Sequence, residues 1–184
     1  LIPLVAFPLT GIIDAGSTST SYVNSITFLF IGGFLIALSM ERWNLHRRIA
    51  LNIINAVGKK ADMLVLGFMI ASAFLSMWIS NTATAVMMLP IGLAIILKME
   101  EEFGKEKTHS ISLVLMLGIA YGCSIGGVAT LVGTPTNLAF VRIFSEAFPE
   151  ASPIAFGQWV IIGIPYSITL IMVTWFLLTK VLCK

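Results

Sequence analysis

Charged side chains are scarce in this chain of 184 residues, and two long runs have none at all. Only 11% of the residues are Asp, Glu, Lys or Arg, and none of these falls within residues 63–97 or 109–141. A soluble domain carries about 25% charged residues. Since 58% of the residues are hydrophobic and the mean hydropathy is +0.97, we expect a membrane protein whose solvent is the lipid bilayer.

Residues that ligate metals or attack substrates are also few. The two cysteines, Cys123 and Cys183, have neither C-x-x-C nor Cys/His spacing, so we interpret them as small packing residues. No Asp lies within residues 63–141, and His46 and His109 only flank the apolar segments. Hydrolysis inside a membrane needs a Ser/His pair, an aspartate dyad or a metal cluster. These absences argue against an enzyme and a proton-coupled carrier, and no basic patch suggests nucleic-acid binding.

The apolar segments predict transmembrane helices separated by polar loops. Residues 25–40 form one predicted transmembrane helix, and residues 155–180 form the last one. Residues 1–9 are interpreted as the end of a further helix. The Gly-, Ser- and Thr-rich residues 10–21 predict a loop, and so do the polar residues 142–152.

Residues 43–60 differ from the predicted spans. Basic residues alternate there at helical spacing with leucine, isoleucine and valine, which predicts an amphipathic helix lying in the membrane interface. These basic residues are Arg47, Arg48, Lys59 and Lys60. Arg142 would lie on the opposite side of the membrane, and the positive-inside rule then places the amphipathic helix in the cytoplasm. The other basic residues expected on the cytoplasmic side are Arg42, Lys98, Lys105, Lys107, Lys180 and Lys184.

The first uncharged run carries Ser80, Asn81 and Thr82 near its centre. Three adjacent hydrogen-bonding side chains are costly in hydrocarbon unless they have a partner or a ligand. Helical arms over residues 63–79 and 83–97 would each reach about 22 to 26 Å, which is short of the ~30 Å hydrocarbon core. We therefore predict a re-entrant hairpin over residues 62–98 with the triplet at its tip; two short spans joined by a tight external turn are the alternative.

The second uncharged run is too long for one straight helix. Residues 109–141 would extend about 50 Å as a helix. Pro135 removes a backbone donor and disfavours helix at Thr134, so we predict a helix broken near Gly133 within residues 109–148. Overlapping G-x-x-x-G spacings before the break indicate close helix packing. These glycines are Gly118, Gly122 and Gly126.

Three motifs in this order resemble those of the divalent anion:sodium symporter family, whose members carry di- and tricarboxylates such as succinate, malate and citrate, and in some cases sulfate. The motifs are ERWNLHRRIAL at residues 41–51, SMWISNTAT at residues 76–84 and GGVATLVGTPTN at residues 126–137. Thr136 stands where the family pattern has a second proline. The resemblance covers most of the chain, and it implies an all-α multi-pass membrane fold with a re-entrant hairpin and a broken transmembrane helix.

The resemblance also implies roles for the motif residues. A sodium ion would be held by Ser76, Ser80, Asn81 and the backbone carbonyl of Gly133. One carboxylate of the substrate would be held by Asn81, Thr82 and Thr134. Neutral oxygen atoms suit Na⁺, and the N-termini of half-helices present free N–H groups to an anion.

The implied architecture divides the chain into a scaffold part and a transport part. The scaffold part is residues 1–61, the transport part is residues 62–148, and the helix of residues 155–180 follows. We expect these residues to be the N-terminal one of two inverted repeats, because such carriers bind substrate between the repeats near the bilayer midplane. The C-terminal repeat would then be missing, and the full-length carrier would be a homodimer in the plasma (inner) membrane.

The expected function is sodium-coupled transport of a C4-dicarboxylate (succinate, malate or fumarate) or of citrate by alternating access. The same fold would also serve a sodium-independent anion exchanger or a sulfate carrier. A structural reading remains open as well, because polar residues in membrane helices also link neighbouring helices without binding a solute. In that case the Ser80 to Thr82 triplet would belong to a structural membrane subunit.

Overall fold

A computed structural model describes residues 2–22, 25–58 and 60–182 of the chain. Lys59, Cys183 and Lys184, for which the sequence analysis made predictions, lie outside these residues. Every regular element of the described part is helical. The elements are α1 (Ile2–Thr10), α2 (Ala15–Tyr22), α3 (Ser25–Arg42), α4 (Leu45–Val57), α5 (Ala61–Ser76), α6 (Asn81–Phe103), α7 (Lys105–Val128), α8 (Pro135–Ala147), α9 (Phe156–Leu177) and the π-helical turn η1 (Leu178–Leu182).

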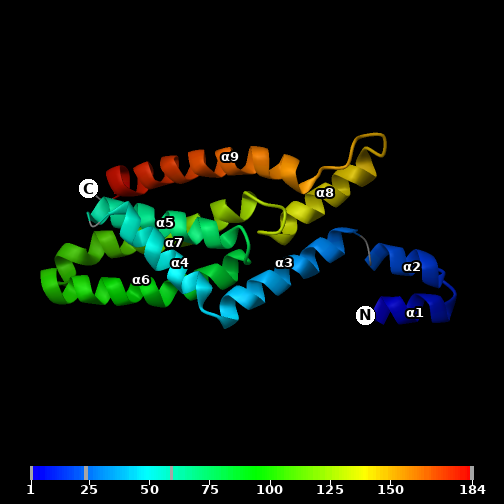
Figure 1. The fold of residues 1–184 in the computed structure, drawn as a ribbon, viewed down its shortest axis with the longest axis horizontal. Coiled ribbons are helices and arrows are strands. Elements are labelled where there is room, and N and C mark those ends of the chain that lie inside the picture. Colours follow the sequence, from blue (N-terminus) through cyan, green and yellow to red (C-terminus); the bar gives the residue numbers. More distant parts are fainter. Residues whose placement is uncertain (1, 23–24, 59, 183–184) are drawn as a thin grey trace.

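Three of these segments are long and apolar enough to cross a membrane. They are Asn81–Phe103, Lys105–Val128 and Phe156–Val181. This confirms the prediction of an all-α multi-pass membrane protein. The helices form an elongated molecule in which α5, α6 and α7 lie roughly along the long axis, while α1 and α2 project from one end (Figure 1).

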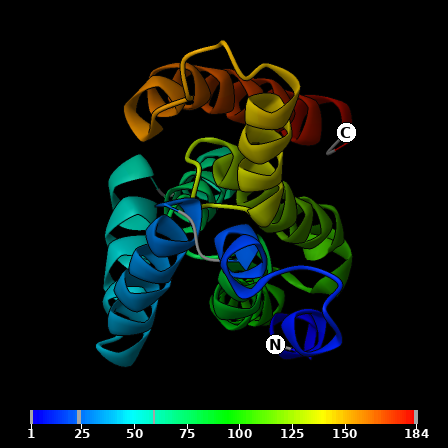
Figure 2. The same ribbon diagram turned by 90° about the vertical axis from the view of Figure 1, so that its right-hand side faces the viewer.

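Helix α5 is the centre of the fold. Its Val65, Phe68, Met69 and Leu75 are completely buried, and the end-on view shows α9 on one side of the α5–α7 bundle and α3 with α4 on another (Figure 2). Helix α5 is apolar around most of its circumference and is buried along most of its length, with Phe74 exposed, which is the pattern of a buried rather than an amphipathic helix. Its apolar sequence therefore reflects burial in protein as much as contact with lipid.

A row of glycines brings α7 against α5. A Cβ atom on Gly118 would lie 3.1 Å from Cγ of Met69, and one on Gly122 would lie 2.8 Å from the Met69 carbonyl oxygen. A Cβ atom on Gly126 would collide with the backbone of Ala73. Because successive glycines meet successive turns of α5, the two helices run in parallel. The packing interpretation of the G-x-x-x-G spacings is confirmed.

Helix α9 is fastened to α5 and α7 along its length. Trp159 and Ser167 donate hydrogen bonds to backbone carbonyls near the end of α7, and Trp175 Nε1 donates to the Asp62 carbonyl over 2.8 Å. Lys180 Nζ also lies 2.8 Å from Asp62 Oδ2. The last turns of α9 therefore lie beside the start of α5, so Lys180 shares the end of the molecule that holds Lys60, as predicted.

Two predicted loops contain helix. Residues 10–21 were expected to be a loop, but α2 begins at Ala15, because Asp14 Oδ1 accepts a hydrogen bond from the Ser17 N–H over 3.0 Å and caps the helix. Residues 142–152 were also expected to be a loop, but α8 continues to Ala147. Arg142 and Glu146, one helical turn apart, form an ion pair of 2.9 Å that supports this extension.

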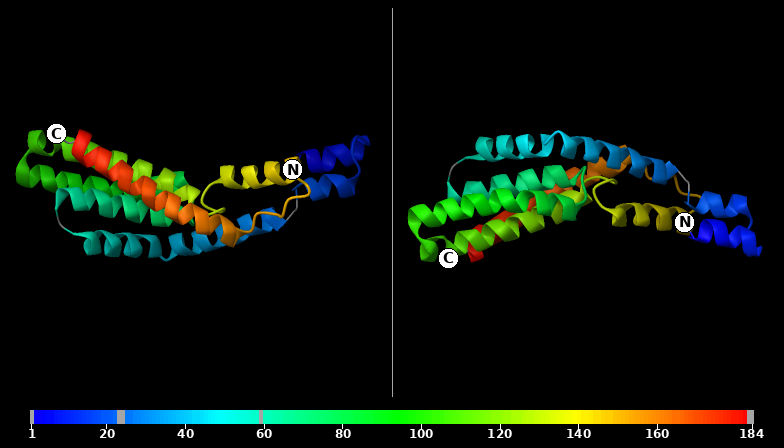
Figure 3. Two further views of the ribbon diagram at one scale, coloured as in Figure 1. Left: turned by 90° about the horizontal axis from the view of Figure 1, so that it is seen from above. Right: turned by 90° about the horizontal axis from the view of Figure 1, so that it is seen from below.

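Helix boundaries elsewhere differ by a few residues from those expected. Helix α4 is shorter than residues 43–60, because Asn44 adopts a left-handed conformation before it and Gly58 has φ of 126° after it. Helix α6 runs past the expected end of the second hairpin arm and stops only at Gly104. In the views from above and below, α3 and α4 follow one another along one long edge of the molecule (Figure 3).

Substituting Gly126 with alanine should destabilise the fold, since its Cβ would strike the backbone of Ala73, which cannot move as a side chain can. Overpacking of this kind costs about 1 to 3 kcal/mol. Gly32→Ala is the matched control, because Gly32 also lies inside a helix but has nothing within 4 Å of the added atom. Unfolding free energies in mixed micelles would measure both variants. Equal stability of the two would contradict the close approach of α5 and α7.

Candidate functional site

The Ser80 to Thr82 triplet lies at the turn between α5 and α6. Helix α5 ends at Ser76 and α6 begins at Asn81, so the triplet is at the tip of a helical hairpin, as predicted. Ser80 is the N-cap of α6, and its Oγ accepts a hydrogen bond from the Ala83 N–H over 3.3 Å. Thr82 is exposed in the first turn of the helix.

The predicted helix break is confirmed at residues 129–134. Helix α7 ends at Val128, and α8 begins at Pro135, which stands at the first helical position with Thr134 as N-cap residue. Proline is favoured at this position because its fixed φ suits a helix and it lacks an N–H that would go unpaired anyway. The Thr134 Oγ1 atom lies 3.2 Å from that of Thr136.

Four carbonyl groups at the end of α7 would lack partners within the helix, and each has one from elsewhere. The Ile125 and Gly126 oxygens accept from Ser167 Oγ and from the Ala129 N–H, both over 3.0 Å. The Gly127 and Val128 oxygens accept from Asn137 Nδ2 and from Trp159 Nε1, both over 2.9 Å. Residues of α8 and α9 thus complete the hydrogen bonding of the broken helix.

The break and the hairpin tip are tied together by Thr130. Its hydroxyl donates a hydrogen bond to the Met77 carbonyl of the tip and accepts one from the Gly133 N–H over 3.1 Å. The carbonyl of Thr130 in turn accepts from the buried Asn137 amide over 2.7 Å. Neither Thr130 nor Asn137 was predicted as a site residue from the sequence. Both lie in the motif of residues 126–137, and an amide side chain just after a predicted helix break was the available signal.

Three predicted sodium ligands meet where the tip touches the break. Ser76 is completely buried, and its Oγ donates to Asn81 Oδ1 over 2.7 Å. A Cβ atom on Gly127 would collide with the Asn81 amide, and one on Gly133 would lie 2.8 Å from the Ser76 carbonyl oxygen. Only glycine at these two positions leaves room for such an approach. Ser76, Asn81 and Gly133 are therefore neighbours although up to 57 positions separate them in the sequence.

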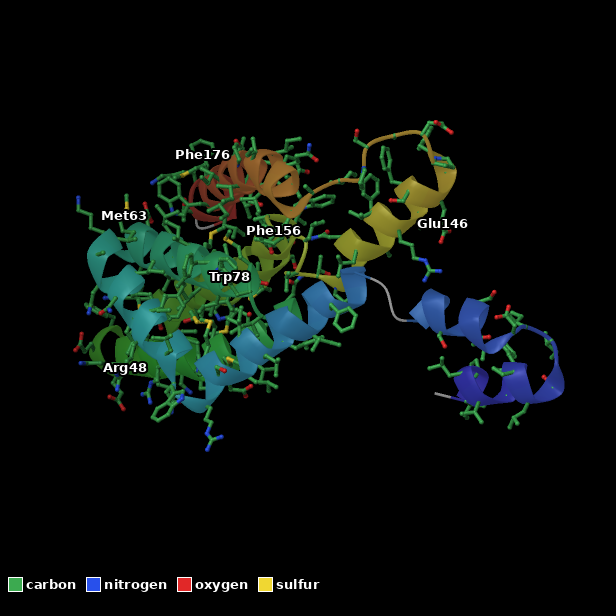
Figure 4. All side chains as sticks on the ribbon, turned by 45° about the vertical axis from the view of Figure 1, so that its right-hand side comes forward. Arg48, Met63, Trp78, Glu146, Phe156 and Phe176 are labelled. Atoms are coloured by element: carbon green, nitrogen blue, oxygen red, sulfur yellow. The ribbon has the colours of Figure 1, made fainter. Side chains whose placement is uncertain are left out.

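A cavity of about 200 Å³ adjoins this contact. Ser80, Gly133 and Pro135 line it from the hairpin and the break, and α3 closes the other side. Trp78, which is half-buried, forms part of its wall (Figure 4). Among the described residues that line the cavity, Glu41 is the one with a charge. The cavity therefore contains no fixed cation to attract an anion.

The oxygen atoms at the contact are hydroxyl, amide and carbonyl groups without charge. Hard cations prefer oxygen ligands, and the two helix N-termini beside them favour negative charge. In the described part of the chain no three His, Cys, Asp or Glu side chains are placed so that they could hold a metal ion together. The arrangement suits an alkali cation next to an anion.

Comparison with known proteins gives two findings. The family model described as citrate transporter matches residues 1–184. A sodium-dependent dicarboxylate transporter of Staphylococcus saprophyticus is 46% identical over 179 residues, covering 95% of this chain and 34% of the relative. One of Staphylococcus aureus is 44% identical over 186 residues, covering 98% and 35%. The chain thus spans about a third of the length of the curated relatives it matches.

Thr130→Val should loosen the tie between the hairpin and the break. Valine has nearly the shape of threonine but leaves the buried Gly133 N–H and the Met77 carbonyl without this partner, at a cost of about 1 to 3 kcal/mol. Thr130→Ser retains the hydroxyl and should lose much less. Unfolding free energies in detergent distinguish them, and a serine variant as unstable as the valine variant would contradict the role of the hydroxyl.

Proposed function

This chain belongs to the citrate transporter family, and we propose that it supplies one half of a sodium-coupled carrier for divalent anions. The observation that carries the proposal is the contact of the hairpin tip with the broken helix, which sets neutral oxygen ligands beside two helix N-termini. The names of the relatives support sodium as the coupled ion and a dicarboxylate as the substrate. Citrate, succinate, malate and fumarate belong to the proposed class.

We assign the sodium ion to Ser76, Ser80, Asn81 and the Gly133 carbonyl. Support comes from the hydrogen bond between Ser76 and Asn81 and from the close approach of Gly133 to Ser76. Ser80 faces the adjoining cavity together with Gly133. A cation at this point would replace the direct contacts among these oxygen atoms, so its binding would fix the tip against the break.

We assign one substrate carboxylate to Asn81, Thr82 and Thr134. Thr82 lies in the first turn of α6 and Thr134 precedes α8, so the carboxylate would receive N–H groups from two helix N-termini. Among the described residues that line the cavity, Glu41 is the charged one, so no lining side chain there offsets the charge of a dianion. The sodium ion would supply that positive charge. Binding of sodium before substrate would then couple the two gradients, and alternating access would move both.

We further propose that the hairpin of α5 and α6 is re-entrant. Helix α5 has 16 residues and measures about 24 Å, which is too short to cross a hydrocarbon core of ~30 Å. Helix α6 is long enough to cross, so the proposal rests on α5 and on the polar residues at the tip. Polar groups at such a tip are tolerated where they are covered by protein or line a cavity; Ser76 is buried and Ser80 lines the cavity. The hairpin and the broken helix, residues 62–148, would move as a transport part against a scaffold of residues 1–61.

The site is incomplete on this proposal, because the second halves of the sodium and substrate sites would come from an inverted repeat outside this chain. Since the relatives are about three times as long as this chain, each has room for a second repeat. We propose a homodimeric carrier in the plasma (inner) membrane without enzymatic activity. A sodium-independent exchanger and a sulfate carrier are the alternatives that the transport experiments decide.

Asn81→Ala should abolish most sodium-driven uptake, because the substitution removes the acceptor of Ser76 and an oxygen ligand. Losing one oxygen ligand of the cation should weaken the apparent affinity for sodium about 10- to 100-fold, which corresponds to about 1.4 to 2.8 kcal/mol. Uptake of labelled succinate into liposomes containing the carrier would be measured against sodium concentration. Ser124→Ala is the control, since Ser124 is exposed on α7 and bonds only to the carbonyl one turn before it.

Uptake that is unchanged when choline or Li⁺ replaces Na⁺ would rule out sodium coupling and favour the exchanger. If Asn81→Ala prevents membrane insertion while sodium dependence of the residual transport stays normal, the triplet has a packing role instead.

Thr82→Ala should weaken substrate binding about tenfold with little effect on sodium binding, because Thr82 is exposed at the tip and makes no described contact with Ser76. Thr82→Ser retains the hydroxyl and should bind normally. Competition of succinate, citrate and sulfate for uptake measures the change. Equal losses for Na⁺ and succinate would contradict the separate assignment of Thr82 to the substrate.

A further inference from the structure

The amphipathic helix α4 has an apolar groove on each side, and an exposed arginine lines each of them. The α4–α6 groove is about 440 Å³ in volume and is lined by Arg47 and Leu51 of α4 and by Pro90 and Ala94 of α6, among others. The α3–α4 groove is about 520 Å³ and contains Arg48 among its lining residues, with Trp43 beside it. Figure 4 shows Arg48 at the periphery of the molecule.

The positions of both arginines are fixed by the fold. His46 Nδ1 lies 3.3 Å from the Met40 carbonyl oxygen, and Asn44 holds the left-handed turn before α4. Ala50 and Ile54 are buried against α5. Because consecutive helical residues point about 100° apart, Arg47 and Arg48 diverge to the two sides of the anchored helix.

Neither arginine is neutralised by a carboxylate of the described residues. The ion pairs found there are Arg142 with Glu146 and Lys180 with Asp62. A guanidinium beside an apolar wall suits a ligand that joins a phosphate or carboxylate to a hydrocarbon body. An anionic phospholipid has this combination, whereas free phosphate would leave the apolar walls uncovered.

The depth of the grooves agrees with this ligand, and this step rests on the re-entrant hairpin proposed above. Pro90 and Ala94 lie about 14 and 20 Å along α6 from Asn81. If the tip lies near the bilayer midplane, these residues reach the boundary of the hydrocarbon, which lies about 15 Å from the midplane. Arg47, which lines the same groove, is then near the boundary between hydrocarbon and headgroups, and Trp43, which is 76% exposed, is close to the level favoured by tryptophan.

We propose that the two grooves beside α4 are binding sites for anionic phospholipids, with the phosphate held by Arg47 in the α4–α6 groove and by Arg48 in the α3–α4 groove. The acyl chains lie against α6 and α3. The sites hold α4 to the membrane at a fixed depth while the hairpin beside it changes position.

Native mass spectrometry of the carrier containing these residues tests the charge requirement. The detergent-purified protein is titrated with phosphatidylglycerol or phosphatidylcholine in the absence of sodium and substrate, so the result is independent of transport. We expect the wild type to prefer phosphatidylglycerol and Arg47→Gln/Arg48→Gln to lose about tenfold or more of that affinity. Lys105→Gln/Lys107→Gln removes the same charge from the start of α7, away from both grooves, and should bind normally. Equal losses in the two double variants, or equal binding of the two lipids by the wild type, would overturn the proposal.

The apolar requirement is tested with Ala94, which lines the α4–α6 groove. Ala94→Trp should fill the groove and reduce phosphatidylglycerol binding by about half, since the α3–α4 groove remains open, whereas Ala120→Trp on an exposed position of α7 should not. The headgroup alone, glycerophosphoglycerol, should fail to displace the lipid. A photocrosslinking residue at position 94 should form an adduct with the mass of one lipid; an adduct with a polypeptide would show that protein covers the groove and would overturn the proposal.

Discussion

A peptide group without a hydrogen-bond partner is costly in hydrocarbon, so a membrane helix can be interrupted only where other parts of the protein supply partners. In this chain two such interruptions meet, the hairpin tip between α5 and α6 and the break after α7, and a hydrogen bond joins them. The tip between α5 and α6 presents the Met77 carbonyl to Thr130 of the break. The end of α7 has all four of its last carbonyls satisfied, by Ala129, Asn137, Trp159 and Ser167. The rest of the fold depends on keeping these segments in contact.

That contact depends on glycines in α7 and on hydrogen bonds that α9 donates to α5 and α7. Gly118, Gly122 and Gly126 allow α7 to lie directly on α5, and Gly127 allows the Asn81 amide to reach the break. Helix α9 then donates from two side chains to the carbonyls of α7 and from Trp175 to the start of α5. The same carbonyls that a broken helix leaves unpaired thus become the attachment points of α9. At the start of α6 and α8, the Ala83 N–H donates to Ser80 Oγ and the Asn137 N–H donates to the Thr134 carbonyl.

The sequence predicted the helices and the two breaks because their signals are local. An uncharged run, a polar triplet at its centre and a proline after Gly133 each restrict the chain within a few residues. The start of α2 depends on the cap by Asp14, and the extension of α8 depends on the ion pair of Arg142 with Glu146. Each is a single side-chain contact in a segment whose composition is typical of a loop. Thr130 and Asn137 could not be found from spacing alone, because their role depends on residues far away in the sequence. Their partners become visible only when the tip and the break are folded together.

The distribution of charge connects the site with the rest of the molecule. Arg47 and Arg48 of α4 line grooves at the periphery. Among the described residues that line the cavity at the tip, Glu41 is the charged one. On the proposed function, a dianion near this carboxylate would meet repulsion and a sodium ion would meet attraction. A bound cation would then reverse the sign of the local field beside the two helix N-termini. A fixed arginine in its place would bind the anion without the cation, so the proposed coupling would follow from using an exchangeable positive charge instead of a permanent one.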